Sequence, residues 1–234
     1  MLIFMIKNIC GIDVLVNRKK VRNIRIKVDG DGVVSLTIPN GCSEKTAIDF
    51  FLSKIEWVKS KTSKKPRKEI FKFNSGEIFY LFGEPIEIVV NLALKRNVKL
   101  VNNKLIVECK TGAEEEIKTL MFKWLTIVLT QKAEQYFSKW NFITKLNHTK
   151  LTIRKTISKW GSCNHDTREI NLSLYLIHLP EFCLEYVIVH ELCHIEYNNH
   201  SKDFYRLLEQ YIPEYSKIRK WMRENSHKYT IKLK

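Results

Sequence analysis

The sequence has six cysteines in 234 residues but contains no CxxC pair. The cysteines are scattered along the chain, at Cys10, Cys42, Cys109, Cys163, Cys183 and Cys193. A disulfide framework is typical of small secreted chains in which the cysteines are closely spaced. We therefore expect reduced thiols and a protein of the cytoplasm.

Long apolar runs and repeats are also missing. The apolar start of the chain, MLIFMIK, becomes charged after six residues, which is too short for a secretion signal or a membrane span. No motif recurs at a fixed period, and there is no low-complexity tract, Walker phosphate loop or acidic magnesium cluster. These absences favour a soluble globular protein that does not cross a membrane.

Basic side chains are in excess, with 40 lysines and arginines against 25 acidic residues and a net charge of +15. This surplus favours an anionic partner such as nucleic acid, a nucleotide or a lipid head group, although a solvated lysine-rich face is its commoner cause. The basic residues considered for such contacts are Arg18, Lys19, Lys20, Arg22, Arg25 and the cluster from Lys64 to Lys68. The hydrophobic share of 44% allows one sizeable core or two small ones.

The first half of the chain has the alternation of β-strands. The segment NIRIKVDGDGVVSLTIP predicts a hairpin around residues 29–32, and residues 73–91 predict a second hairpin, followed by a strand at 104–110. Ser43 is placed to cap a helix over residues 44–60, which has apolar side chains at helical spacing. The basic segment TSKKPRK then predicts an exposed connection.

The second half begins with the longest helical pattern, over residues 114–140. The elements expected after it are strands at 150–158 and 168–177, a helix from Pro180 through His194, and helices at 201–211 and 213–225. We expect an α+β fold with a β-rich N-terminal region over residues 1–112 and a second domain over residues 113–234.

Three of the seven histidines lie within eleven residues, in the segment VIVHELCHIEYNNHSKDF. Residues four apart on an α-helix lie on one face, so His190 and His194 can share one ion. Zinc accepts neutral imidazole nitrogens, and a catalytic site keeps three protein ligands with one position open to water. Glu191 is placed to take a proton from that water.

His200 can reach the same ion only if the helix ends before it. Tyr197, Asn198 and Asn199 provide this end, and Asn198 is the residue expected in the left-handed conformation. The spacing is that of the metzincin motif, with Tyr197 at the position of its glycine.

The other flank of the helix carries an apolar stripe that should fix it against a core: Leu184, Val187, Ile188, Leu192 and Ile195. Cys193 points away from the ligand face and should be a small core residue. Two alternatives remain open. The histidines could be satisfied surface residues, and His165 could touch the substrate or replace His200 as a ligand if the turn WGSCNHDT faces the metal.

These motifs resemble the YgjP-like family of zinc-dependent metallohydrolases, which is grouped beside the SprT-like and WLM metallopeptidases. The similarity covers nearly the whole chain, from RNIRIKVDGDGVVSLTIPNG through SGEIFYLFGEPIEI to the segment between KWGSC and RKWM. The resemblance implies that His190, His194 and His200 bind one Zn²⁺ and that Glu191 is the general base and then the acid. It also implies a zincin-like second half with antiparallel strands.

The resemblance further places a loop, Trp160 to Cys163, and a strand, Ile170 to Leu174, beside the cleft. The substrate-binding residues expected from it are Trp160, Gly161, Ser162, Asn171 and Ser173. If the strand lies at an edge, it could pair with an extended peptide.

The activity expected is therefore that of a zinc metallopeptidase acting on a protein or peptide. Two alternatives stay open: a metal-dependent nucleoside triphosphate pyrophosphatase, and a nucleic-acid-binding protein or DNA-associated protease. The oligomeric state is not indicated by the sequence.

Overall fold

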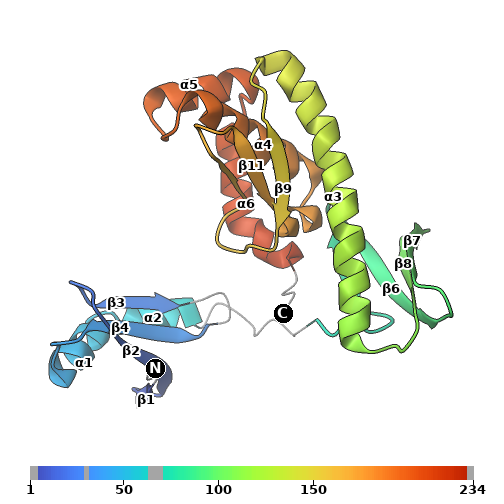
Figure 1. The fold of residues 1–234 in the computed structure, drawn as a ribbon. Helices are drawn as coiled ribbons and strands as arrows, with labels where there is room; N and C mark the ends of the chain where they lie inside the picture. Colours follow the sequence, from blue (N-terminus) through green and yellow to red (C-terminus); the bar gives the residue numbers. More distant parts are fainter. Residues whose placement is uncertain (1–4, 29–31, 63–70, 231–234) are drawn as a thin grey trace. The chain divides into compact units, whose positions relative to one another are not determined.

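A computed structural model describes residues 5–28, 32–62 and 71–230 of the chain (Figure 1). The chain divides into two compact units, Met1–Ile70 and Phe71–Lys234. Each unit has its own cluster of buried apolar side chains. In the part of the chain that the structure describes, no helix has the length and apolar character needed to span a membrane.

The first unit is a four-stranded sheet with two helices. Its elements are β1 (Met5–Ile9), β2 (Ile12–Lys19), β3 (Arg25–Val28), β4 (Val34–Pro39), α1 (Glu44–Leu52) and α2 (Ile55–Thr62). The strand order is β1-β2-β4-β3, with β2 parallel to β4 and both outer pairs antiparallel. The predicted hairpin of β3 and β4 is confirmed, although residues 29–31 of its turn lie outside the described residues.

The predicted helix after Ser43 is confirmed at its start and divided near its middle. The Ser43 hydroxyl accepts a hydrogen bond from the backbone N–H of Thr46 at 3.1 Å, as an N-cap does. The regular helix stops at Leu52, where the hydroxyl of Ser53 donates to the carbonyl of Phe50 at 2.7 Å and competes with the helical ladder. The predicted basic connection, TSKKPRK, lies outside the described residues from Ser63 onward.

The second unit opens with a sheet of the same layout. Its strands are β5 (Ile78–Leu81), β6 (Glu84–Leu92), β7 (Asn97–Val101) and β8 (Lys104–Cys109), in the order β5-β6-β8-β7. The inner pair is again parallel and the outer pairs antiparallel. The first turn of each sheet also matches, because Cys10 and Gly11 in one, and Phe82 and Gly83 in the other, all have positive φ. Each sheet leads into a helix.

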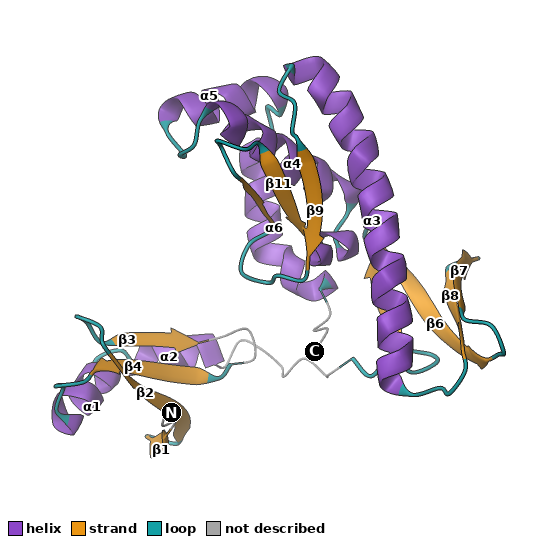
Figure 2. Ribbon diagram, in the orientation of Figure 1, coloured by secondary structure: helices purple, strands orange, loops and turns teal. Residues whose placement is uncertain are grey.

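In the second unit this helix is α3 (Glu114–Thr144), which runs beside the β5–β8 sheet and continues past the next sheet of the chain (Figure 2). The predicted domain boundary after residue 112 falls inside this unit. Leu105 and Val107 of β8 lie in one buried cluster with Met121 and Leu125 of α3, so the strands and the helix share a core.

The remainder of the unit is a three-stranded sheet with helices. Its elements are β9 (Lys150–Arg154), β10 (Gly161–Cys163), β11 (Glu169–Ser173), the 3₁₀ helix η1 (Leu174–His178), α4 (Glu181–Glu196), α5 (Lys202–Tyr211) and α6 (Tyr215–Tyr229). The strand order is β10-β11-β9, with β9 parallel and β10 antiparallel to β11.

This topology corrects three expectations. Strand β11 is central and not at an edge, because β10 forms in the segment expected to be only a turn. The chain crosses from β9 to the far side of β11 to form β10, so the β9–β11 pair is parallel and not antiparallel. Residues 174–177 are helical and not extended, because the Ser173 hydroxyl accepts from the N–H of Tyr175 at 3.2 Å and starts η1.

Two carboxylates near the start of α4 fasten this helix to α3. Glu181 accepts a hydrogen bond from the hydroxyl of Tyr136 at 2.9 Å and pairs with Lys132 at 2.9 Å. One turn later, Glu185 accepts from the indole N–H of Trp140 at 2.9 Å and from Lys139 at 2.6 Å. Both carboxylates make charge-assisted hydrogen bonds, so the position of α4 along α3 is fixed over two successive turns.

Candidate metal centre

Helix α4 carries the first two histidines and is anchored by its apolar stripe. All five residues of the predicted stripe are buried, namely Leu184, Val187, Ile188, Leu192 and Ile195. Cys193 is also fully buried, and burial raises the pKa of its thiol to about 12, so it is a neutral core residue as expected. The ligand face of α4 is therefore held on a rigid element.

The structure brings His190, His194 and His200 together. One ring nitrogen from each histidine lies within 4.8 Å of the others, and the Nε2 atoms of His190 and His200 are 3.1 Å apart. Two ligands placed about 2.0–2.1 Å from one ion in tetrahedral directions lie roughly 3.3 Å apart. The spacing of these nitrogens thus fits a shared metal ion.

The protonation of the imidazoles fits as well. Burial, followed by the charges of His194 and His200, lowers the pKa of His190 to about 3. Burial also lowers the pKa of His194. The Nδ1–H of His194 donates to the carbonyl of Tyr197 at 2.9 Å, which leaves its Nε2 lone pair for a ligand. The lowered pKa values favour the neutral form of His190 and His194, which is the form that metals bind.

The chain reverses between His194 and His200 without a left-handed residue. Helix α4 ends at Glu196, and Tyr197 is extended at φ −125° and ψ 109°. No residue from Tyr197 to Asn199 has a positive φ, so the expectation for Asn198 is wrong. The carbonyl of Tyr197 is held by His194 instead, and an extended residue at this position has no need of glycine.

The ring of Phe204 packs against all three imidazoles. It lies in the first turn of α5, which Ser201 caps by accepting from the Phe204 N–H at 3.3 Å. Its ring centroid lies 4.9, 4.5 and 4.9 Å from those of His190, His194 and His200. This role of Phe204 was not predicted, because a single aromatic residue near the last histidine is a weak signal.

Glu191 lies beside the ligands and is 4% exposed. Burial raises the pKa of its carboxyl to about 8, opposed by the charge of Lys159 and by a backbone hydrogen bond from Cys163. Among the described residues, its Oε2 atom has no hydrogen-bond partner. A buried carboxylate oxygen without a protein partner is suited to bind water or substrate.

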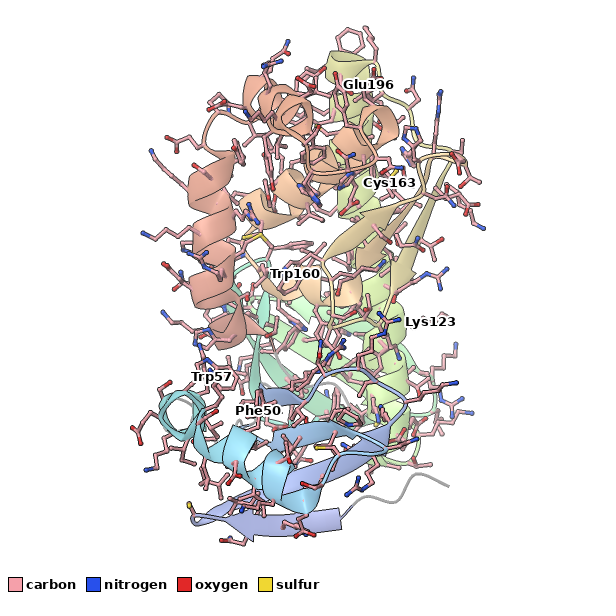
Figure 3. All side chains as sticks on the ribbon, turned by 90° about the vertical axis from the view of Figure 1, so that its left-hand side faces the viewer. Phe50, Trp57, Lys123, Trp160, Cys163 and Glu196 are labelled. Carbon is pink, nitrogen blue, oxygen red and sulfur yellow. The ribbon has the colours of Figure 1, made fainter. Side chains whose placement is uncertain are left out.

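Gly161 on β10 makes room for this carboxylate. A Cβ atom added at Gly161 would lie 2.8 Å from both Cγ and Cδ of Glu191 and closer still to Oε1. Only glycine permits this approach, so the WGSC motif positions the base directly. Trp160 and Cys163 stand at the two ends of the strand (Figure 3).

Two adjoining hollows lie at the site, one that includes residues of the metal centre and one beside it. The first, of about 460 Å³, is lined by His190, Glu191 and residues of β10, α4 and α6. The second, of about 310 Å³, lies over the three-stranded sheet. The two share the lining residues Lys159 and Gly161, so they adjoin at β10, and together we call them the cleft.

Four of the five expected substrate-binding residues line this cleft. Trp160 and Gly161 line the first hollow, and Gly161, Ser162 and Asn171 line the second. Ser173 is not brought to the cleft, because it is fully buried and its hydroxyl donates to the carbonyl of Thr156 at 2.6 Å.

His165 is also outside the group of ligands. Its ring is exposed, and Nδ1 donates to the main-chain carbonyl of His194 at 3.1 Å. This bond ties the β10–β11 turn to the end of α4. The cationic residues of the cleft, such as Lys159 and Arg219, were not predicted, because Arg219 reaches the cleft from α6, far along the chain.

Comparison with known proteins identifies a family. The family model "YgjP-like, metallopeptidase domain" matches residues 22–225. Similar solved structures include two metallopeptidase zymogens, abylysin of Pyrococcus abyssi and jannalysin of Methanocaldococcus jannaschii, each 22% identical with a TM-score of 0.36. The matches cover 43% of this chain and 99% of abylysin, and 39% of this chain and 94% of jannalysin. A search of curated proteins gave no match.

Proposed function

Since the chain belongs to the YgjP-like metallopeptidase family, we propose that it hydrolyses peptide bonds with one zinc ion held by His190, His194 and His200. The observation that carries this proposal is the convergence of three imidazole nitrogens within 4.8 Å of one another, with His190 and the buried carboxyl of Glu191 lining the same hollow. Zinc is the metal proposed because all three donors are imidazole nitrogens.

A zinc ion bound there would lower the pKa of a water molecule and polarise the scissile carbonyl. Glu191 would accept the proton of the attacking water and pass it to the departing amine nitrogen. Burial raises the pKa of this carboxyl, so it holds an accepted proton well enough to act as an acid afterwards. The bound metal, as a nearby positive charge, would bring that pKa down into the range of a working base.

Strand β10 would hold the substrate backbone. Among the described residues it pairs only with β11, so its other edge is not used by another strand. An extended peptide could add to this edge through main-chain hydrogen bonds, with its scissile bond beside Glu191. The pairing with an extended peptide that was expected of β11 is thus proposed for Gly161 and Ser162 on β10.

The test is the Glu191→Gln variant, which keeps the size of the side chain and removes the base. We expect it to retain zinc, measured by elemental analysis, and to lose cleavage of casein or of a quenched fluorescent peptide by at least about a hundredfold. Glu196→Gln is the matched control, because Glu196 is exposed on the same helix. Full activity of Glu191→Gln would refute the assignment of the base.

The pyrophosphatase alternative has less support. Triphosphate hydrolysis commonly uses Mg²⁺ held by carboxylates. In the described ranges, the three histidines are the only group of three or more potential ligands, and it contains no carboxylate. Pyrophosphate release from a nucleoside triphosphate, assayed beside peptide cleavage, separates the two activities.

The nucleic-acid alternative rests on the first unit. Lys19, Lys20, Arg22 and Arg25 are exposed there, but Arg18 donates to the carbonyls of residues 39, 40 and 42 and so has a structural role. The Lys64–Lys68 cluster lies outside the described residues. Retention on DNA at low salt that falls as salt rises would support this version. The cytoplasm remains the proposed location, since all six thiols are unpaired.

A further inference from the structure

The cleft is lined by four cationic side chains, which we call the cleft cations: Arg154, Lys159, Arg219 and Arg223. Lys159, Arg219 and Arg223 line the hollow that contains the metal centre, and Arg154 and Lys159 line the neighbouring one. Among the residues that the structure describes, Glu191 supplies the only carboxylate that lines either hollow. The cleft is therefore cationic on both sides of β10.

The cleft cations are not neutralised by other side chains. Arg154, Lys159 and Arg219 make no ion pair with any residue that the structure describes, and Arg223 has only the adjacent Glu224 at 3.7 Å. Their charges affect the ionisation of side chains at the metal centre. Lys159 lowers the pKa of Glu191, and Arg219 contributes to lowering the pKa of His190. A divalent ion on the histidines would add to this positive field.

Two of the guanidinium groups are held in place by neighbouring side chains. Arg219 donates from Nη1 to the hydroxyl of Tyr205 at 3.3 Å, and its Cζ lies 5.9 Å from the centre of that ring. Tyr205 is in turn stacked on Tyr215, at 5.7 Å and 19°. Arg154 donates from Nε to Oδ1 of Asn171 at 2.6 Å. Each guanidinium keeps further N–H donors, so both are preorganised to bind a planar anion.

We propose, on the basis of the proposed peptidase function, that the enzyme selects peptides with acidic side chains on both sides of the scissile bond. Arg219 and Arg223 would bind a carboxylate on one side, Arg154 a carboxylate on the other, and Lys159 lies where the two hollows meet. Carboxylates bound there would offset the repulsion among the cations and the metal.

Internal side chains fit this cleft better than a C-terminal carboxylate does. A chain paired with β10 would present alternate side chains to the two faces of the sheet, so it could reach the residues that line both hollows, which adjoin at Lys159 and Gly161. A terminal carboxylate could occupy only one of them and would leave the cations of the other without an anion. The enzyme would thus be an endopeptidase with cationic subsites for acidic side chains on either side of the scissile bond.

The test compares three quenched fluorescent peptides that share one scissile bond. The first has flanking glutamates, the second has glutamines at the same positions, and the third is neutral apart from a free C-terminal carboxylate near the bond. We expect kcat/KM for the glutamate peptide to exceed that for the glutamine peptide by roughly tenfold or more, since charge-assisted hydrogen bonds are stronger than neutral ones. A preference for the third peptide would overturn the endopeptidase assignment.

Substitutions of the cleft cations test whether these residues cause the preference for the glutamate peptide. Arg219→Gln and Arg154→Gln should each reduce the glutamate preference severalfold, and Arg219→Lys should restore part of it because the charge is kept. Lys220→Gln is the matched control, since Lys220 is exposed on the same helix and does not line either hollow. An equal loss of preference in Lys220→Gln would refute the assignment to the cleft.

A binding measurement keeps this inference separate from the proposed function. Fluorescence anisotropy with the Glu191→Gln variant should give tighter binding of the glutamate peptide than of the glutamine peptide, weakening as salt rises. Equal cleavage and equal binding of both peptides would overturn the inference and leave the peptidase function standing. Binding preference without cleavage of any peptide by the wild type would instead refute the proposed function. Stronger competition by a nucleoside triphosphate than by the glutamate peptide would refute the peptide as ligand.

Discussion

The substitution Gly161→Ala tests how the base is positioned. The added methyl carbon would lie 2.8 Å from Cγ and Cδ of Glu191, whereas ordinary van der Waals contact begins near 3.4 Å. The carboxylate must therefore move by several tenths of an ångström, or β10 must move away from α4. Both responses displace Glu191 relative to the three histidines without removing any functional group.

The size of the effect follows from this overlap. Overpacking of a fitted site costs about 1–3 kcal/mol of stability, and an ångström of misplacement at a reacting group costs about a hundredfold in rate. We expect Gly161→Ala to lower kcat by ten- to a hundredfold and the free energy of unfolding by about 1–3 kcal/mol, with zinc content unchanged because no ligand is touched.

The assays are peptide cleavage, urea denaturation and elemental analysis. Gly41→Ala is the matched control, because it carries the same change in the unfolded chain, its φ is not positive, and the added Cβ meets nothing within 4 Å. Wild-type kcat in Gly161→Ala would show that the approach of β10 to Glu191 has no part in catalysis.

Three further predictions concern the metal, the protonation of the site and the first unit. His200→Ala should lower the zinc content of the purified protein, because it supplies the third nitrogen of the group, and unchanged stoichiometry would place that ligand elsewhere. In metal-free protein, the unfolded chain binds a proton near the ordinary histidine pKa of about 6.5, whereas burial lowers the pKa of His190 to about 3 when folded. The stability that His190 contributes is therefore lost as the pH falls from about 6.5 toward 3. Because the raised pKa of Glu191 acts in the opposite sense over this range, the test uses EDTA-treated Glu191→Gln protein, and a melting temperature that does not fall between about pH 7.5 and 5 would contradict this. Ser43→Ala should cost about 1 kcal/mol of unfolding free energy by removing the cap of α1, and equal urea midpoints would contradict this. Ser60→Ala is the control, because Ser60 is exposed inside α2 and is not an N-cap.

The histidine pair was predictable because its signal is local. The spacing of His190 and His194, with a glutamate between them, needs only the pitch of one helix. The path to His200 was predicted in outcome but not in conformation. The left-handed state expected of Asn198 was inferred from residue type alone, whereas the observed extended turn depends on the bond from His194 to Tyr197.

Non-local features of the site escaped prediction. Strand β10 has three residues and exists because Gly161 and Cys163 pair with Leu172 and Ile170 of β11. Its formation moved β11 to the centre of the sheet. No periodicity in so short a segment distinguishes a strand from a turn.

The long elements of the fold were predictable for the opposite reason. Helix α3 follows the pattern seen at residues 114–140, and the hairpins of β3 with β4 and of β5 with β6 follow from their alternation. The shared layout of the two sheets was not visible, because their matching turns use different residues, Cys10 in one and Phe82 in the other. What is common to them is backbone conformation.

The two sheets share a layout but differ in how they are connected to the metal centre. The β5–β8 sheet is packed into the same core as the metal centre, because its strands and α3 belong to the buried cluster that also contains residues of α4. The β1–β4 sheet has a separate buried cluster, which shares no described residue with that of the β5–β8 sheet. Substitutions within this first cluster therefore leave the packing around the helix that carries His190 and His194 unchanged.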